Sequence, residues 1–305
     1  MARSTTSTPP LPSTERARSD RRWSLKLTAR SSIAHGGETR GTITLLRRET
    51  VVTSPGNYMQ VPIISGNSLR GRLRRIGEEL LRDELRYEGT LSAAAAHALR
   101  GGGALAKVSG EPLSGNRLNR VRTLVPLIGV FGAAAGGCII DGALSVGKVV
   151  PHLRETAHIT GVASSVSAFQ AVQLESYTRL DDSDAHDFAE VLPASALELG
   201  TDGTPGVQPD PGSRQMLFQV ETFPAGTEFS TWLQLRRPTD LEASFLADVL
   251  QEYSRHATLG GRSAIGHGVV DVANQTTSGQ VDPLLWRKHL RKHRDETLDA
   301  LTLLT

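Results

Sequence analysis

An amphipathic helix that opens on glycine and asparagine constrains this fold more than any other segment. The stretch ISGNSLRGRLRRIGEELL covers residues 64–81. Its apolar residues recur at i, i+4, i+7 and i+11, so they share one stripe of a helix that faces a core. That stripe consists of Leu69, Leu73, Ile76 and Leu80. Asn67 or Ser68 can cap the first turn, and four arginines are predicted to lie off the stripe, at Arg70, Arg72, Arg74 and Arg75.

Strand-like segments lie on both sides of this helix. Residues 23–29 alternate apolar and polar side chains, and after a turn at Gly36 and Gly37 residues 41–46 resume strand-like composition. Further helices are predicted at residues 90–99, 241–255 and 283–304, and further strands at 143–150, 215–221, 227–235 and directly after a glycine-rich turn at 259–270. The basic segment at residues 116–122 is predicted to be a loop. Strands interleaved with helices, without a run of short βαβ repeats, favour an α+β sheet fold with insertions.

The composition is that of an ordered globular chain. Its 305 residues are 38% hydrophobic, which excludes wholesale disorder, and the length fits two modules or one domain with large insertions. The single cysteine, Cys138, excludes an internal disulfide and any cysteine-rich zinc site. Residues 1–22 have no apolar core and cannot be a secretory signal, so we expect a cytoplasmic protein. Residues 123–140 are uncharged but contain Pro126, and they predict a loop and a buried strand, not a membrane span.

Charge is distributed unevenly along the chain. The formal net charge is only +2. Residues 1–122 hold 21 basic and 10 acidic residues, whereas residues 123–280 hold 8 basic and 18 acidic ones. This separation predicts a polyanionic partner for the first part and a basic partner for the second. Nine acidic residues fall within residues 175–210 beside the single Arg179, and we interpret this segment as an insertion that projects from the fold.

The start of the first long helix combines the features of a phosphate-binding site. A capped helix N-terminus offers free backbone N–H groups and the positive end of the helix dipole, and Gly66 and Gly71 allow close approach. Arg70 and Arg72, one turn further on, can add charge-assisted hydrogen bonds. The segment lacks the Lys-Ser/Thr ending of a Walker loop, which excludes that nucleoside-triphosphatase motif. An ordinary capped surface helix with solvated arginines is the alternative.

A second glycine-rich segment, LGGRSAIGHGVVDV at residues 259–272, precedes a predicted strand. A dinucleotide-binding fingerprint follows a strand and opens a helix, so this segment is not one. Arg262 and Ser263 therefore either lie near a backbone ligand or belong to a purely structural turn.

Taken in order, these motifs resemble the RAMP superfamily of CRISPR-associated proteins. More narrowly, they are similar to backbone subunits that polymerise along a guide RNA in multisubunit effector complexes. The resemblance rests on the loop at His35, the helix start at 66–72, the segment ETFPAGTEF at 221–229 and the loop GGRSAIGHG at 260–268. It covers roughly residues 23–150 and 214–272, and the order of the motifs is more specific than any one of them.

The resemblance implies a ferredoxin-like, RNA-recognition-type palm with an inserted helical finger region and a thumb hairpin. The implied organisation is a disordered basic tail, the palm with its finger insertion, the thumb insertion, the completion of the palm and a C-terminal amphipathic helix, at residues 1–22, 23–174, 175–226, 227–280 and 281–305. In such subunits the guide backbone lies across the palm, and the thumb of a neighbouring subunit flips a base at regular intervals.

Carried onto this sequence, the resemblance and the basic residues imply RNA contacts in three loops and along the finger. The implied RNA-binding residues are His35, Gly36, Gly37, Gly66, Asn67, Ser68, Arg70, Gly71, Arg72, Arg74, Arg117, Arg120, Gly260, Gly261, Arg262 and Ser263. The implied partners are a guide RNA (crRNA), further copies of this chain in a head-to-tail filament, other CRISPR effector subunits and a complementary target nucleic acid. No cofactor, metal or membrane is expected.

One departure from the family bears on catalysis. Target-cleaving type III relatives carry an aspartate after the first glycine loop, whereas GTITLLRR at residues 41–48 has none. We therefore expect RNA binding without catalysis, and a type IV subunit. The alternative is a metal-dependent endoribonuclease acting on guide or target RNA, with His35, Glu38 or the acidic cluster at 181–184 in chemical roles. A third hypothesis is a structural module whose arginines contact an acidic protein.

Overall fold

A central antiparallel sheet carries the fold. The computed structural model describes residues 16–17, 19–54, 56–103, 113–135, 137–179, 216–276 and 281–304. Strand β1 (Arg21–Ala29) pairs with β13 (Glu228–Leu235) on one side and with β14 (Val270–Thr276) on the other. Two short strands, β9 (Leu144–Val146) and β10 (Val150–Pro151), extend the sheet beyond β13.

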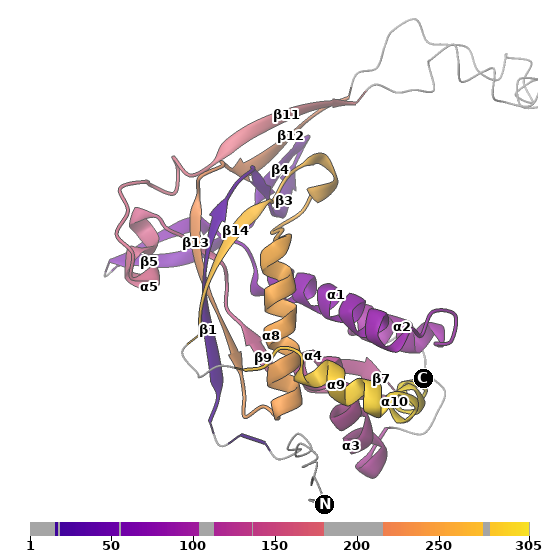
Figure 1. Cartoon of the computed structure of the whole chain (residues 1–305). Helices are drawn as coiled ribbons and strands as arrows, with labels where there is room; N and C mark the ends of the chain where they lie inside the picture. The colour runs from indigo at the N-terminus through magenta and orange to yellow at the C-terminus, as the bar shows by residue number, and fades with distance from the viewer. Residues whose placement is uncertain are drawn as a thin grey trace, which may run out of the picture.

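Two long helices cover one face of this sheet (Figure 1). Helix α1 (Gly66–Leu85) lies between β1 and β9 in the chain, and α8 (Asp240–Arg255) lies between β13 and β14. On β1, Trp23, Leu25 and Leu27 are buried and alternate with the exposed Ser24 and Lys26. Such alternation is required of a sheet with one packed face and one open face. The predicted α+β class is confirmed.

The apolar stripe of α1 is also confirmed, because Leu69, Leu73, Ile76 and Leu80 are all buried. The predicted cap is wrong. Ser65 is the N-cap, with extended backbone, and its Oγ accepts a hydrogen bond from the Ser68 N–H at 3.3 Å. The helix therefore begins at Gly66, and both Asn67 and Ser68 lie within its first turn.

Shorter helices pack beside α1 and α8, namely α2 (Ala93–Arg100), α3 (Gly115–Leu124), α4 (Pro126–Phe131), α9 (Leu285–Lys292) and α10 (Arg294–Leu301). The basic segment predicted as a loop is therefore helix α3. Residues 123–140, predicted as a loop and a strand, hold α4 and the hairpin of β7 (Ala133–Ala135) and β8 (Cys138–Ile140). Every residue of α4 is buried, so no amphipathic period marks it, and Pro126 occupies its first turn, where a missing N–H is harmless. The C-terminal helix is broken at His293.

A second sheet lies above the first in Figure 1. It contains β11 (Gln173–Arg179), β12 (Met216–Phe223), β4 (Ile43–Leu46) and β3 (Gly36–Arg40), in that order, and β2 (Ile33–Ala34) also pairs with β12. The predicted thumb insertion at 175–226 begins within β11 and ends three residues after β12. Both strands extend away from the helices (Figure 1). Residues 180–215, with most of the insertion's acidic residues, lie outside the described residues.

A hairpin outside the two sheets packs against a short helical segment. The sequence did not predict the hairpin of β5 (Arg48–Ser54) and β6 (Asn57–Pro62), which packs against the segment containing α5 (Ala157–Thr160).

The predicted tail 1–22 is wrong at its end, because Arg21 and Arg22 belong to β1 and the Ala17 N–H donates to Pro238 O at 2.8 Å. Within the described residues, no helix is both long and apolar enough to cross a bilayer.

Candidate nucleic-acid interface

The short strand β2 is the point at which three loops meet. Ala34 O accepts a hydrogen bond from the Gly261 N–H at 2.7 Å, which attaches the glycine-rich loop to β2. The next residue, His35, has its Nε2 3.1 Å from the backbone nitrogen of Ser65, the N-cap of α1. The structure thus brings together the predicted residues His35–Gly37, the start of α1 at residues 66–68, and the loop at 260–263.

The His35 imidazole accepts the hydrogen bond from the Ser65 N–H, which requires the neutral ring with its proton on Nδ1. Burial lowers the pKa of His35, and the nearby Arg47 guanidinium lowers it further. Both effects favour the neutral form. At neutral pH, His35 is therefore a hydrogen-bond acceptor that positions the start of α1.

Mild acid should destabilise the fold through His35. Because its folded-state pKa lies below the unfolded value of about 6.5, its contribution is complete above that pH and is lost as the pH falls through the folded-state pKa. His35→Gln keeps an acceptor for the Ser65 N–H but does not titrate. Urea unfolding of both proteins at about pH 7.5 and about pH 5.5 should show a smaller loss in the variant. Equal losses would contradict this role, since all other histidines are common to both proteins.

The glycine-rich loop approaches β2 too closely for a side chain at Gly260. Gly260 has φ +80, and a Cβ there would lie 2.3 Å from Ala34 O. Any other residue would push the loop away from β2 or strain the backbone. The close approach fixes where Arg262, two residues further on, leaves the surface.

Arg262 is held over an aromatic pair. Its guanidinium carbon lies 5.7 Å from the Tyr177 ring centroid and 5.3 Å from that of Phe218, and the two rings stack at 5.4 Å. These aromatic residues face each other across β11 and β12. Arg262 is exposed, and no carboxylate pairs with it within the part of the chain that the structure describes. An arginine oriented in this way can bind a phosphate.

A part-buried polar network lies beside Arg262. The Tyr177 hydroxyl contacts Glu175 Oε2 at 2.7 Å and also the Nε2 of the buried His267. Burial alone would raise the pKa of the Glu175 carboxyl, but hydrogen bonds from Ser32, Tyr177, Thr222 and Gln173 hold it at about 2. Glu175 was predicted to belong to the projecting acidic insertion. It instead joins the glycine-rich loop to the base of the β11–β12 hairpin.

Arg47 is a candidate that the sequence reasoning missed. Its N–H donates to His35 O at 2.9 Å, and its carbonyl accepts from the Ile63 N–H at 2.9 Å, so its backbone lies between two of the converging loops. Its side chain is exposed and has no ion-pair partner among the described residues. The only sequence signal was the pair Arg47-Arg48, and Arg48 instead forms an internal ion pair with Glu221 at 2.5 Å.

Arg74 has a structural role. The prediction that it binds a phosphate is wrong, because its guanidinium is used inside the protein. Its side chain is buried, and its guanidinium donates to Leu99 O at 2.7 Å, to Gly132 O at 2.8 Å and to Ala98 O. Arg70 Nη2 likewise donates to Phe131 O at 2.7 Å. These carbonyls lie at the ends of helices α2 and α4, where the last carbonyls of a helix lack intrahelical partners. Ala98 O differs from the others in that it also accepts from the Gly102 N–H at 3.1 Å. Burial lowers the pKa of Arg74 to about 10, so it is still charged at neutral pH.

The structure does not bring the predicted finger residues to the converging loops. Arg117 and Arg120 lie on α3, which Figure 1 places far from β3 and β4. Arg120 forms an exposed ion pair with Asp299 at 3.7 Å. On α1, Gly71 has open space around it, and Arg72 has a buried Nε.

Of the residues suggested for metal or acid–base chemistry, His35 and Glu38 are among those that the structure describes. Glu38 is exposed and pairs with Arg40 at 3.2 Å. The acidic cluster at 181–184 lies outside the described residues. Among residues 16–17, 19–54, 56–103, 113–135, 137–179, 216–276 and 281–304, no group of three His, Cys, Asp or Glu side chains could hold a metal ion.

Comparison with known proteins finds one matching family model and similar solved structures. A family model described as the RAMP superfamily matches residues 26–271. Among solved structures, a chain from one titled "Type IV-B CRISPR Complex" is 30% identical, with a TM-score of 0.56, over 85% of this chain and 92% of that chain. The "Crystal structure of Thermofilum pendens Csc2" matches at 14% identity and a TM-score of 0.41, over 93% of this chain and 82% of that one. No curated protein matches the chain.

Proposed function

This chain belongs to the RAMP superfamily, as the order of its motifs predicted, and from that premise we propose that it is a non-catalytic, RNA-coating subunit of a CRISPR effector ribonucleoprotein. The similarity to a chain of a type IV-B CRISPR complex, over most of both chains, supports a CRISPR RNA-associated role and a type IV assignment. The proposed ligand is a guide RNA.

The observation that carries this proposal is the convergence of three loops at β2. Exposed arginines, Arg47 and Arg262, lie in or beside these loops, and neither has an ion-pair partner among the described residues. The first turn of α1 adds backbone N–H groups and the positive end of a helix dipole. Cations and backbone donors of this kind bind phosphates and do not read bases, so the proposed binding is independent of sequence.

The topology of the central sheet supports the proposed ferredoxin-like palm. Its strands and long helices follow the chain order β1, α1, β9, β13, α8, β14, and the spatial order is β14, β1, β13, β9, with all neighbours antiparallel. In this proposal the helices α2, α3 and α4 form the finger region, and β11 and β12 form the base of the thumb.

The proposed assembly is a head-to-tail filament of this chain along the RNA, joined by other effector subunits. A heterologous contact that does not close generates an open helical filament. The charge separation along the chain supports such a contact, because a net-basic first part of one copy can face the net-acidic second part of the next. Target nucleic acid would pair with the guide in this assembly.

Binding of labelled single-stranded RNA at increasing salt tests the proposed function. We expect similar affinities for unrelated sequences, and a logarithmic affinity that falls with the logarithm of salt by about 0.7 for each phosphate neutralised. A protein that binds no RNA at low salt would contradict the proposal. Strong preference for one sequence would contradict the backbone mode of binding.

The same RNA, incubated with Mg²⁺ or Mn²⁺, tests the absence of catalysis. We expect it to stay intact. Cleavage that disappears in Glu38→Ala or Asp182→Ala would establish the endoribonuclease alternative, because those carboxylates were its candidate metal ligands. Cleavage that persists equally in both of these variants and in His35→Ala would indicate a contaminating nuclease.

A further inference from the structure

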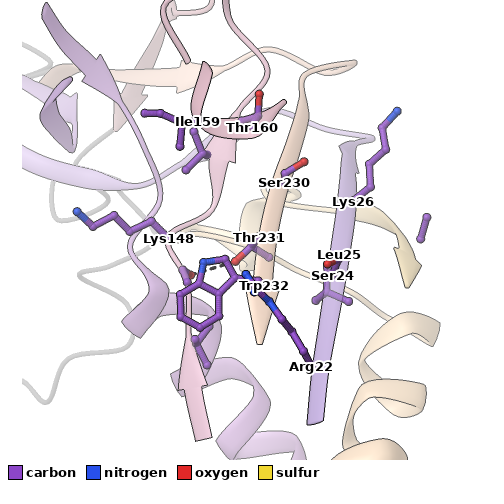
Figure 2. A pocket seen from close by; sticks show the side chains of 14 residues that line it. Arg22, Ser24, Leu25, Lys26, Lys148, Ile159, Thr160, Ser230, Thr231 and Trp232 are labelled. Atoms are coloured by element: carbon purple, nitrogen blue, oxygen red, sulfur yellow. Dashed lines mark hydrogen bonds between the residues drawn. The ribbon is translucent and has the colours of Figure 1, made fainter. Parts of the chain in front are cut away.

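The open face of the central sheet carries a groove that the converging loops do not use (Figure 2). Its volume is about 760 Å³. Arg22, Ser24 and Lys26 of β1 line it, and these residues alternate with side chains that face the helices. The opposite wall is formed by the chain at residues 146–150 and the end of α5. The groove therefore lies on the other side of the sheet from α1 and α8.

Trp232 of β13 provides a flat aromatic surface in this groove. It is 38% exposed, whereas Trp23 and Trp286 are buried at 4% and 0%. Its indole lies against Gly147, where a Cβ would come within 2.6 Å of Nε1, so only glycine permits this position. The Arg22 guanidinium carbon is 5.4 Å from the ring centroid. An exposed ring fixed against backbone in this way can stack on a nucleobase.

The charge around Trp232 favours a nucleic acid over a protein. The charged residues that line the groove are all basic, namely Arg22, Lys26 and Lys148. Two carboxylates lie at its edge, since Glu228 pairs with Lys26 at 2.8 Å and Glu49 pairs with Lys148. Hydroxyl groups of Ser24, Ser230 and Thr160 also line the groove, together with apolar side chains such as Val146 and Ile159. Cations and hydroxyls around one aromatic ring match the phosphates and sugar of a nucleotide.

One residue, Gly147, lies close to both the groove and the start of α1. A Cβ at Gly66, the first residue of α1, would lie 2.8 Å from Gly147 O, and Gly147 also contacts Trp232. The start of α1 and the indole therefore border the same short segment of chain. An RNA strand bound at the start of α1 would reach the groove within a few nucleotides.

We infer that this groove binds one nucleotide of a single-stranded RNA, with its base stacked on Trp232. The base takes the place of Arg22 over the ring, and Arg22 and Lys148 pair with the flanking phosphates. This inference rests on the proposed RNA-binding function and adds to it a stacking position on the open face of the sheet. Because every base has a flat face, the position tolerates any sequence.

Tryptophan fluorescence tests this inference directly, since Trp232 is the exposed one of the three tryptophans. In the free protein, acrylamide should quench chiefly Trp232. Adding single-stranded oligouridine should quench Trp232 emission and protect the remaining signal from acrylamide. Trp232→Ala should weaken oligouridine binding about tenfold or more, and Trp232→Phe, which keeps an aromatic face, should restore most of it.

Tyr58→Ala is the matched control, because Tyr58 is 70% exposed but lies on the β5–β6 hairpin. We expect its oligouridine affinity to equal that of the unmodified protein. RNA binding that leaves Trp232 open to acrylamide, with equal affinities for Trp232→Ala and the unmodified protein, would overturn the stacking site and leave the proposed function standing. Absence of RNA binding by the unmodified protein would instead overturn the proposed function.

Discussion

Replacing Arg74 with methionine should lower the free energy of unfolding by about 3 kcal/mol or more. Methionine fills similar space but cannot donate to the carbonyls of Leu99, Gly132 and Ala98, which Arg74 now satisfies. The Ala98 carbonyl keeps the Gly102 N–H as a partner at 3.1 Å. The carbonyls of Leu99 and Gly132 lie at two helix ends inside the protein, so losing the guanidinium costs them the full penalty of burying an unpaired polar group. Urea denaturation followed by circular dichroism measures the change.

Arg75→Met is the matched control for this prediction, because Arg75 is the next residue of α1 and is exposed. We expect its stability to stay within about 0.5 kcal/mol of the unmodified protein. The Arg74→Met variant, measured at a temperature where it is still folded, should bind RNA as the unmodified protein does. If Arg74→Met instead has normal stability and weakened RNA binding, Arg74 is a phosphate ligand, as the sequence suggested.

Replacing Arg47 and Arg262 together with alanine should reduce RNA affinity by about 100-fold near 0.1 M salt. Each arginine is proposed to make a charge-assisted hydrogen bond to a phosphate, worth about a factor of ten. The loss of two phosphate contacts should also make the salt dependence shallower by about 1.4 in logarithmic slope. Fluorescence anisotropy of labelled RNA across a salt series measures both quantities.

A double variant with the same change of charge controls for net charge. Arg75 and Arg82 both lie on α1 beyond its first turn, and both are at least partly exposed. Replacing them with alanine should change RNA affinity far less than the loop variant does. Equal losses in the two double variants would mean that overall charge, and not the converging loops, determines binding.

The periodic elements of the fold were predictable because each has one packed face. The alternation on β1 and the four-residue stripe of α1 both follow from that condition, and both were confirmed. Helix α4 and the burial of Arg74 were missed for the converse reason. Helix α4 is buried all round, and α1 packs against α8 as well as α2 and α4, so a residue outside its apolar stripe is still covered.

The candidate interface was only partly predictable. Its glycine-rich loops have recognisable sequences, but the contact between Ala34 and Gly261 joins residues far apart in the chain, and no spacing predicts it. Arg47 could not be distinguished from Arg48 by sequence, because the difference is the internal carboxylate of Glu221. The groove at Trp232 depends on Gly147 lying beneath the ring, which only the folded chain shows.

Electron microscopy of the purified chain, with and without long single-stranded RNA, tests the central claim most directly. With RNA at low salt we expect helical filaments whose length follows the length of the RNA, and we expect ribonuclease or high salt to disperse them. Isolated particles of single-chain size in the presence of excess RNA at low salt would contradict an RNA-coating function.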